Sequence, residues 1–186
     1  MQLWDPTMAS EEVECLGKHI RAGMTVLDIG SNEGPHTFFF ADRGCQVVAL
    51  EPNPETFVKL KEKIARYGNQ IELLPDKLLA YKPARQFDVI ISTMVLHFFA
   101  AEDIQPAIAK TKSWTKPNGY NVISAYTNQN PPGKRPYLFG HNELLSYYED
   151  WKTIEYAERP TPWFIFPEGT RPRRNQAVYL TAQKPG

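Results

Sequence analysis

The sequence predicts an α/β protein in which a mostly parallel β-sheet is covered by helices on both faces. Three observations predict this class. The first two-thirds of the chain alternate short apolar runs with longer helix-like segments. The connections between them carry glycine or proline where helices begin or end. No internal repeat or low-complexity tract interrupts the alternation. Strands that alternate with helices are joined by crossovers, and crossovers of this kind produce parallel strands.

The N-terminal half carries clear signals for the ends of its elements. Ser10 is a favourable N-cap for a helix that Gly23 would end. Pro35 and Pro54 fit the first turn of a helix, where the missing N–H costs nothing. Short apolar runs between these helices predict buried strands. The elements expected here are a helix over 11–21, a strand over 24–29, a helix over 35–43, a strand over 46–51, a helix over 54–67 and a weak strand over 71–74.

The C-terminal half begins with the clearest strand, FDVIIS, and ends with two proline-rich loops. Proline clusters lie at 131–136 and 160–172. No flexible linker or compositional break divides the chain, so we expect one domain over 1–186 with a loop rich in Pro, Arg and aromatic residues at 160–175. The elements expected here are strands over 87–92, 120–125, 153–158 and 177–182, helices over 103–114 and 142–148, and a turn at Pro117-Asn118-Gly119.

Composition limits the possible functions. The chain has 186 residues, of which 42% are hydrophobic and 23% charged, as in ordinary soluble proteins. Lys plus Arg and Asp plus Glu number 21 each, and this balance disfavours nucleic acid as the main partner. No apolar run is long enough to span a membrane, and no signal-peptide pattern opens the chain. Two cysteines are too few for a disulfide framework, so we expect a cytoplasmic protein with reduced thiols.

The segment VLDIGSNEG, residues 26–34, is the most informative stretch. A turn that leaves a parallel strand and enters a helix presents free backbone N–H groups, and glycines let a ligand approach closely. Glu51 ends the next strand 21 residues after Gly30, where an acidic side chain can bind the ribose of a nucleotide. The alternatives are a glycine turn without a ligand and a solvated strand-end glutamate. The combination favours a nucleotide site.

The turn also favours one kind of nucleotide. It lacks the middle glycine of the G-x-G-x-x-G fingerprint that holds a dinucleotide pyrophosphate. It places Asp28 before the first glycine and Glu33 inside the turn. Two carboxylates disfavour a pyrophosphate and suit a ligand with a positive charge, such as a sulfonium. We therefore expect S-adenosylmethionine rather than NAD.

Together, VLDIGSNEG, Glu51 and FDVIISTMVLHFF resemble the class I S-adenosylmethionine-dependent methyltransferases over roughly residues 9–185. The stretches STMVLHFF, KPNGYNVISA and ELLSYYEDWKTIEY resemble the tellurite-resistance TehB-type branch more specifically. The resemblance implies a Rossmann-like, doubly wound sheet with an antiparallel last strand. The family turn is usually D-x-G-C-G-x-G, and this chain has Ser31 in place of the Cys and Asn32 in place of the Gly that follows it. Asn tolerates a positive φ well, so we expect the turn to keep its shape.

The same resemblance implies a site for S-adenosylmethionine, with S-adenosylhomocysteine as product. Asp28 and the Gly30–Gly34 turn would line the methionine end, and Glu51 would hold the ribose. Asp76 would meet the adenine amino group, although a loop-capping role is the alternative there. Thr93 and Met94, just past the fourth strand, would flank the methyl group. The implied cofactor-binding residues are Asp28, Gly30, Ser31, Asn32, Gly34, Glu51, Pro52, Asp76, Thr93 and Met94.

Candidate catalytic residues are His97, Arg171 and Arg173. His97 lies past a strand end, so it is either a general base or a half-buried packing residue. The aromatic and arginine-rich loop at 160–175 has three possible roles. It is a lid that binds an anionic acceptor, or it contacts nucleic acid, or it is a hairpin that packs on the body of the domain. The TehB resemblance implies that this region carries a histidine–arginine pair and a further arginine near the substrate. No histidine follows His141 here, so only the arginine carries over, to Arg171 or Arg173.

These observations predict methyl transfer to a small-molecule acceptor, with an anionic compound, a thiol or a chalcogen oxyanion as candidates. The alternatives are a catalytically quiet S-adenosylmethionine-binding module, an NAD-dependent enzyme and an RNA or protein methyltransferase. No zinc, P-loop or nucleophile-elbow motif is present, and we expect no metal site.

Overall fold

A seven-stranded sheet forms the centre of the described part of the chain. The computed structural model describes residues 5, 7–131, 133, 135–163 and 174–186. The strand order is β3-β2-β1-β4-β5-β7-β6, and β7 runs antiparallel to both its neighbours while β1 to β5 are parallel. This order and the antiparallel β7 confirm the predicted fold class. The strands are β1 Thr25–Ile29, β2 Gln46–Leu50, β3 Ile71–Leu74, β4 Phe87–Thr93, β5 Thr115–Tyr126, β6 Lys152–Pro160 and β7 Gln176–Gln183.

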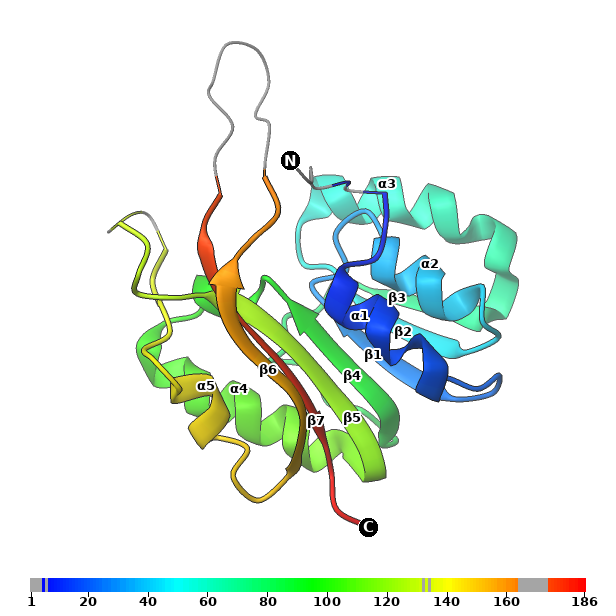
Figure 1. Cartoon of the computed structure of the whole chain (residues 1–186). Coiled ribbons are helices and arrows are strands. Elements are labelled where there is room, and N and C mark those ends of the chain that lie inside the picture. The colour runs from blue at the N-terminus through cyan, green and yellow to red at the C-terminus, as the bar shows by residue number, and fades with distance from the viewer. Residues whose placement is uncertain (1–4, 6, 132, 134, 164–173) are drawn as a thin grey trace.

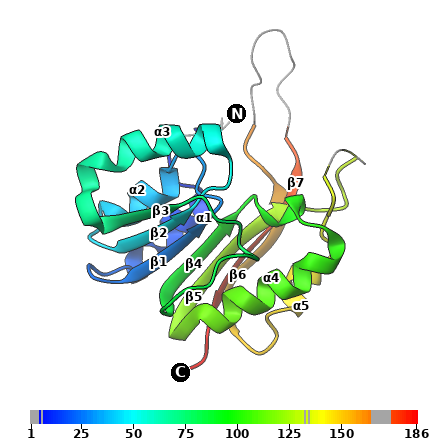
Figure 2. The same cartoon turned by 180° about the vertical axis from the view of Figure 1, so that it is seen from behind.

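Helices cover both faces of the sheet (Figures 1 and 2). Helices α1 and α2 lie on one face with α3, and α4 lies with α5 on the other. No helix within the described ranges has both the length and the apolar character needed to cross a membrane. The helices are α1 Glu11–Leu16, α2 Pro35–Ala41, α3 Pro54–Ile64, α4 Ala101–Trp114 and α5 Glu143–Ser146, with 3₁₀ turns at Gly17–His19, Ala65–Gln70 and Leu96–Phe98.

Alternation along β1 explains why its residues serve both faces. Successive strand side chains point to opposite sides of a sheet. Leu27 and Ile29 are buried in the cluster that includes α4 and α5, whereas Val26 is buried with α1 and α2. Asp28 shares the face of Val26, and its carboxylate accepts a hydrogen bond from Thr37 of α2. The same alternation therefore places a carboxylate under the first turn.

Three boundaries differ from the sequence prediction by three residues or more. The first helix ends at Leu16, and a single 3₁₀ turn replaces its predicted continuation to residue 21. The third helix ends at Ile64 and continues as a 3₁₀ segment, with Gly68 out of helical geometry. β5 begins at Thr115 instead of residue 120, because the predicted turn lies inside the strand as an irregularity. Asn118 has a φ of 63° there, so the predicted turn is present, but it does not mark the start of the strand.

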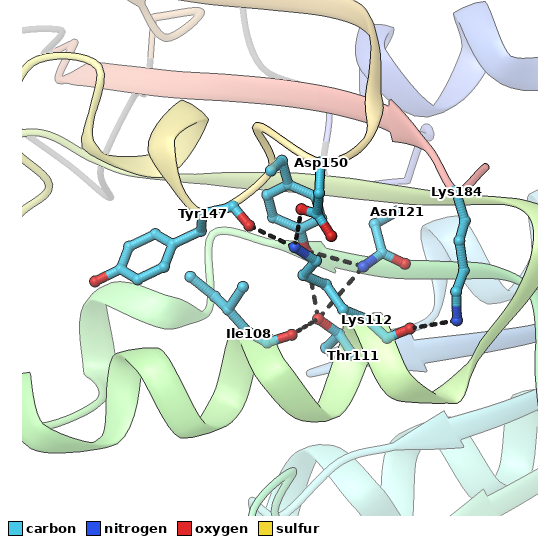
Figure 3. Close-up of polar contacts among 8 residues, drawn as sticks. Ile108, Thr111, Lys112, Asn121, Tyr147, Asp150 and Lys184 are labelled. Carbon is cyan, nitrogen blue, oxygen red and sulfur yellow. Dashed lines mark hydrogen bonds and ion pairs between the residues drawn. The ribbon is translucent and has the colours of Figure 1, made fainter.

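A polar network attaches α4 to β5 and to the segment after α5 (Figure 3). The Nδ2 of Asn121 donates to the hydroxyl of Tyr148 at 2.9 Å. The Nζ of Lys112 donates to the carbonyl of Tyr147 at 2.7 Å and pairs with Asp150. The Nζ of Lys184 donates to the Lys112 carbonyl at 3.0 Å. Since Asn121 and Tyr148 are buried, these bonds satisfy polar groups that would otherwise destabilise the core.

Candidate cofactor and acceptor site

A cavity of about 1110 Å³ opens at the carboxyl ends of β1, β2 and β4. This is the edge at which open α/β sheets bind ligands. Helix α1 and the ends of β6 and β7 complete its walls. The structure brings most of the predicted cofactor residues together here. Those that line the cavity are Gly30, Ser31, Asn32, Glu51, Pro52, Asp76, Thr93 and Met94.

The turn after β1 depends on residues in left-handed geometry. Gly30 has a φ of 73°, and a Cβ there would lie 2.5 Å from Cγ2 of Val95. Asn32 has a φ of 49°. Gly34 caps α2 with a φ of 95°, and Pro35 occupies the first turn of that helix. The prediction that Asn32 accommodates positive φ is confirmed, so the turn keeps its shape without the usual glycine.

Glu51 is held in place by the backbone on both sides. Only 6% of the residue is exposed. Its Oε2 accepts a hydrogen bond from the Asn32 N–H, and its Oε1 accepts one from the Asn53 N–H, each at 2.8 Å. The side chain of Asn53 in turn caps α3. A carboxylate oxygen can accept more than one hydrogen bond, so Glu51 is fixed and still able to bind hydroxyl groups from the cavity.

Asp28 and Glu33 do not line the cavity, so the argument that both carboxylates face the ligand is wrong. Asp28 is 1% exposed beneath the turn, and its Oδ2 accepts a hydrogen bond from the Thr37 hydroxyl at 2.6 Å. Burial raises the pKa of Asp28 to about 7, and the charge of Glu51 adds to this rise. Glu33 instead pairs with Lys63 of α3 at 2.6 Å, because α3 places a positively charged side chain beside it.

Gly34 is the other predicted cofactor residue outside the cavity wall. A Cβ at this position would lie 2.7 Å from Leu60 and 2.8 Å from Phe38. Its place is therefore fixed by the close packing of α2 against α3. We assign Gly34 a role in shaping the turn.

His36 lines the cavity and was missed by the sequence analysis. Its Nε2 accepts a hydrogen bond from the Ser10 N–H at 3.2 Å, and its Nδ1 lies 3.2 Å from Oγ1 of Thr93. Because Nε2 is an acceptor, the proton of the neutral ring is on Nδ1 and is donated to Thr93. Burial lowers the pKa of His36 to about 4, so the ring is neutral near pH 7. The sequence signal that could have identified His36 is its position directly after Pro35, in the first turn of the helix that follows the glycine turn.

Met94 holds an unusual backbone conformation at the cavity wall. Its φ is 56°, in a region that costs a residue with a side chain about 1–2 kcal/mol. A hydrogen bond from the Met94 N–H to the Ser124 carbonyl at 2.7 Å supports this conformation. Strain of this kind gathers at ligand sites, where the surrounding structure enforces it.

His97 lies away from the cavity wall. It is 1% exposed, and its ring lies between those of Phe98 and Tyr126, at centroid distances of 4.3 and 4.2 Å. Burial, assisted by the charge of Arg135, lowers the pKa of His97 to about 3. This environment favours the packing interpretation over the general base.

The other two predicted catalytic residues, Arg171 and Arg173, lie outside the described residues. The described N-terminal end of their loop does reach the site, because Thr161 and Pro162 line the cavity. Three further side chains that the sequence analysis did not single out line it as well: Glu12 of α1, Arg159 of β6 and Tyr179 of β7.

The strand order, with a cavity built on the first glycine turn and the acidic end of β2, defines the class I S-adenosylmethionine-dependent methyltransferases. A family model described as tellurite resistance protein TehB matches residues 3–161. The chain belongs to the TehB family.

Individual relatives support the same assignment. The chain is 29% identical over 86% of its length to a protein named Hemagglutinin 1 from Eikenella corrodens, and covers 54% of that protein. It is also 29% identical, over 72% of its length, to a probable S-adenosyl-L-methionine-dependent methyltransferase TehB from Haemophilus influenzae, of which it covers 48%. The crystal structure of TehB from H. influenzae superposes with a TM-score of 0.85 and 26% identity, over 95% of this chain and 62% of that one. The chain thus spans about half the length of the curated relatives it matches.

Proposed function

We propose that this chain transfers the methyl group of S-adenosylmethionine to a small-molecule acceptor, and that residues 1–186 form one domain for this reaction. The observation that carries the proposal is the position of Glu51. Its carboxylate ends β2, is fixed by two backbone N–H groups and lines the cavity beside the glycine turn. A rigid acceptor of hydrogen bonds at this position suits the two hydroxyl groups of a ribose.

The remaining cavity residues fit the other parts of the cofactor. Asp76 is half-buried in the wall beyond β3 and can accept hydrogen bonds from the adenine amino group. The turn over Gly30–Asn32 would bind the methionine end. Thr93 and Met94 would flank the methyl group, with the Thr93 hydroxyl oriented by His36.

Methyl transfer requires no covalent intermediate with the protein. The sulfonium of S-adenosylmethionine is already an activated leaving group. The protein aligns the acceptor with the methyl group and excludes water. The candidate acceptors from the sequence are an anionic compound, a thiol and a chalcogen oxyanion, and the family description makes tellurite the first oxyanion to test.

The test has two parts. Calorimetry with S-adenosylhomocysteine measures cofactor binding, and release of S-adenosylhomocysteine from S-adenosylmethionine in the presence of each acceptor measures methyl transfer. Binding that is lost in Glu51→Ala, together with turnover of a small acceptor, is the expected result. Binding without turnover of any acceptor would support the quiet binding module. No binding at all would reject the cofactor.

A further inference from the structure

The part of the cavity away from Glu51 contains a second set of buried polar groups. Glu12 of α1 is 4% exposed and lines the cavity. Its Oε1 accepts a hydrogen bond from the Ser124 hydroxyl at 3.0 Å. Ser124 and Tyr179 are register partners across β5 and β7, so their side chains project from the same face of the sheet. Glu12 therefore lies over this pair of strands, beyond the strands that carry the cofactor residues.

Tyr179 supplies an unpartnered polar group in the same wall. It is 3% exposed, lines the cavity, and its hydroxyl has no hydrogen-bond partner among the described residues. Burial, followed by the charge of Glu12, raises the pKa of Tyr179 well above its ordinary value, so the hydroxyl stays protonated. A buried hydroxyl without a partner is destabilising unless a ligand supplies one.

Arg159 is a cation of this region, and its guanidinium is already engaged. Its guanidinium lies 4.4 Å from the centroid of the Tyr179 ring. Its Nη2 donates to Oε2 of Glu11 at 2.9 Å. An anionic acceptor would therefore meet the carboxylate of Glu12, which forms no ion pair with a described residue, whereas an acceptor with an N–H or O–H group would find a hydrogen-bond acceptor there.

Two large apolar side chains lie at the exposed part of the cavity. Met8 is 56% exposed and Phe98 is 64% exposed, and both line the cavity. Exposed side chains of this size beside a buried polar pocket suit an acceptor with an apolar body and one polar, reactive end.

We propose that Glu12 and Tyr179 form the acceptor subsite, and that it takes a neutral, partly apolar small molecule whose nucleophilic nitrogen or oxygen carries a hydrogen. This inference rests on the proposed function. The lone pair of the nucleophile forms the new bond to the methyl carbon, and the electron pair of the S–CH₃ bond moves to sulfur, which neutralises the sulfonium. The proton of the nucleophile passes to the Glu12 carboxylate, and Tyr179 orients the acceptor.

Binding of matched probes to the protein saturated with S-adenosylhomocysteine tests the class of acceptor. The probes are phenol and aniline, which are neutral near pH 7, and benzoate and selenite, which are anionic. We expect the wild type to bind the neutral probes at least tenfold more tightly than the anions. Glu12→Gln should remove most of this discrimination, because the amide does not repel anions. Equal or tighter binding of the anions by the wild type would overturn the inference.

Tyr179→Phe gives a second, independent variant that removes only the unpartnered hydroxyl. We expect phenol and aniline to bind about threefold to tenfold more weakly, with the affinity for S-adenosylhomocysteine unchanged within about threefold, as for the loss of one neutral hydrogen bond. Unchanged affinity for both probes would contradict the role of Tyr179. Glu62→Gln is the matched control for Glu12→Gln, since Glu62 is an exposed glutamate of α3 that does not line the cavity.

Turnover tests the proton transfer. With aniline or phenol, Glu12→Gln should slow release of S-adenosylhomocysteine by about a hundredfold or more, the usual effect of losing a general base. With thiophenol, whose thiolate carries no proton at pH 8, the same variant should not slow the reaction, because no proton is transferred and the repulsion of the anion is removed. Equal losses with all three probes would refute proton transfer. If none of them turns over, the binding comparison decides, and failure of S-adenosylhomocysteine to bind would instead reject the proposed function.

The pH dependence gives a signature that a structural role would not produce. Burial raises the pKa of Glu12, and the charge of Arg159 opposes this rise. The other titratable groups that line the cavity in the described part of the chain are Asp5, Glu11, Glu14, His36, Glu51, Asp76, Lys77 and Tyr179. Glu12 must be ionised to take a proton, so the rate with aniline should fall as pH decreases through its raised pKa. This limb of the profile should disappear in Glu12→Gln.

Discussion

Glu51→Ala is the substitution that separates the cofactor site from an ordinary strand end. If the carboxylate holds both ribose hydroxyls, the change removes two hydrogen bonds to a charged group, each worth about 1.5–3 kcal/mol. The affinity for S-adenosylhomocysteine should therefore fall by about a hundredfold or more. The structure adds a second effect, because the Asn32 and Asn53 N–H groups also lose their acceptor. Water in the cavity can replace it, so we expect the free energy of unfolding to fall by only about 1–2 kcal/mol.

Calorimetry and thermal unfolding measure the two effects separately. A loss of about 1–2 kcal/mol corresponds to a decrease in Tm of about 2–8 °C for a chain of this size. Glu55→Ala is the matched control, because Glu55 is an exposed glutamate in the first turn of α3 and its side chain lies outside the cavity wall. It should leave the affinity unchanged within about threefold. Wild-type affinity in Glu51→Ala would refute the assignment of the ribose site, whatever the change in Tm.

Five further substitutions test the rest of the site. Asn32→Gly should retain or improve S-adenosylhomocysteine affinity in calorimetry, since glycine relieves a positive φ of 49° at a cost of about 1 kcal/mol; lost binding would show that the Asn32 side chain contacts the ligand. His97→Gln should lower Tm at pH 7 and leave turnover unchanged. The lowered pKa of His97 also means that its contribution to stability, complete above about pH 6.5, is lost progressively towards its folded pKa of about 3, so the variant should lose less stability than the wild type on acidification. Arg171→Ala and Arg173→Ala should raise the acceptor KM or lower kcat if the acceptor is anionic, with cofactor affinity within about threefold; wild-type kinetics on every acceptor would make the loop a structural hairpin. Asp28→Asn should abolish any release of protons on S-adenosylmethionine binding, measured calorimetrically near pH 7 in buffers of different ionisation enthalpy, because Asp28 has a folded pKa of about 7.

The sequence predicted the fold and the cofactor half of the cavity because both depend on local patterns. Glycines, prolines and short apolar runs mark each crossover of the sheet. Parallel strands then bring their carboxyl ends to one edge whatever the details of packing. Gly30, Glu51 and Thr93 therefore come together as a consequence of topology alone.

The acceptor half was not predictable in the same way. Glu12 lies on a helix before the first strand, and Tyr179 lies on the last strand of the sheet. Nothing near either residue in the sequence indicates the other, because the pairing of β5 with β7 brings them together. His97 shows the opposite error. It follows a strand end at the expected edge, but a 3₁₀ turn directs its ring between Phe98 and Tyr126.

The carboxylates of the first turn show how a correct cofactor can follow from an incomplete argument. The prediction assumed that Asp28 and Glu33 face the ligand, but strand alternation buries Asp28 and α3 attracts Glu33. Asp28 is buried beneath the turn, where water screens its charge little, whereas Glu33 is exposed and paired with Lys63. The raised pKa of Asp28, caused first by burial, leaves its charge sensitive to what binds above it. A sulfonium would favour the ionised form of Asp28 and a neutral thioether would not, so this buried carboxylate would distinguish substrate from product without contacting either.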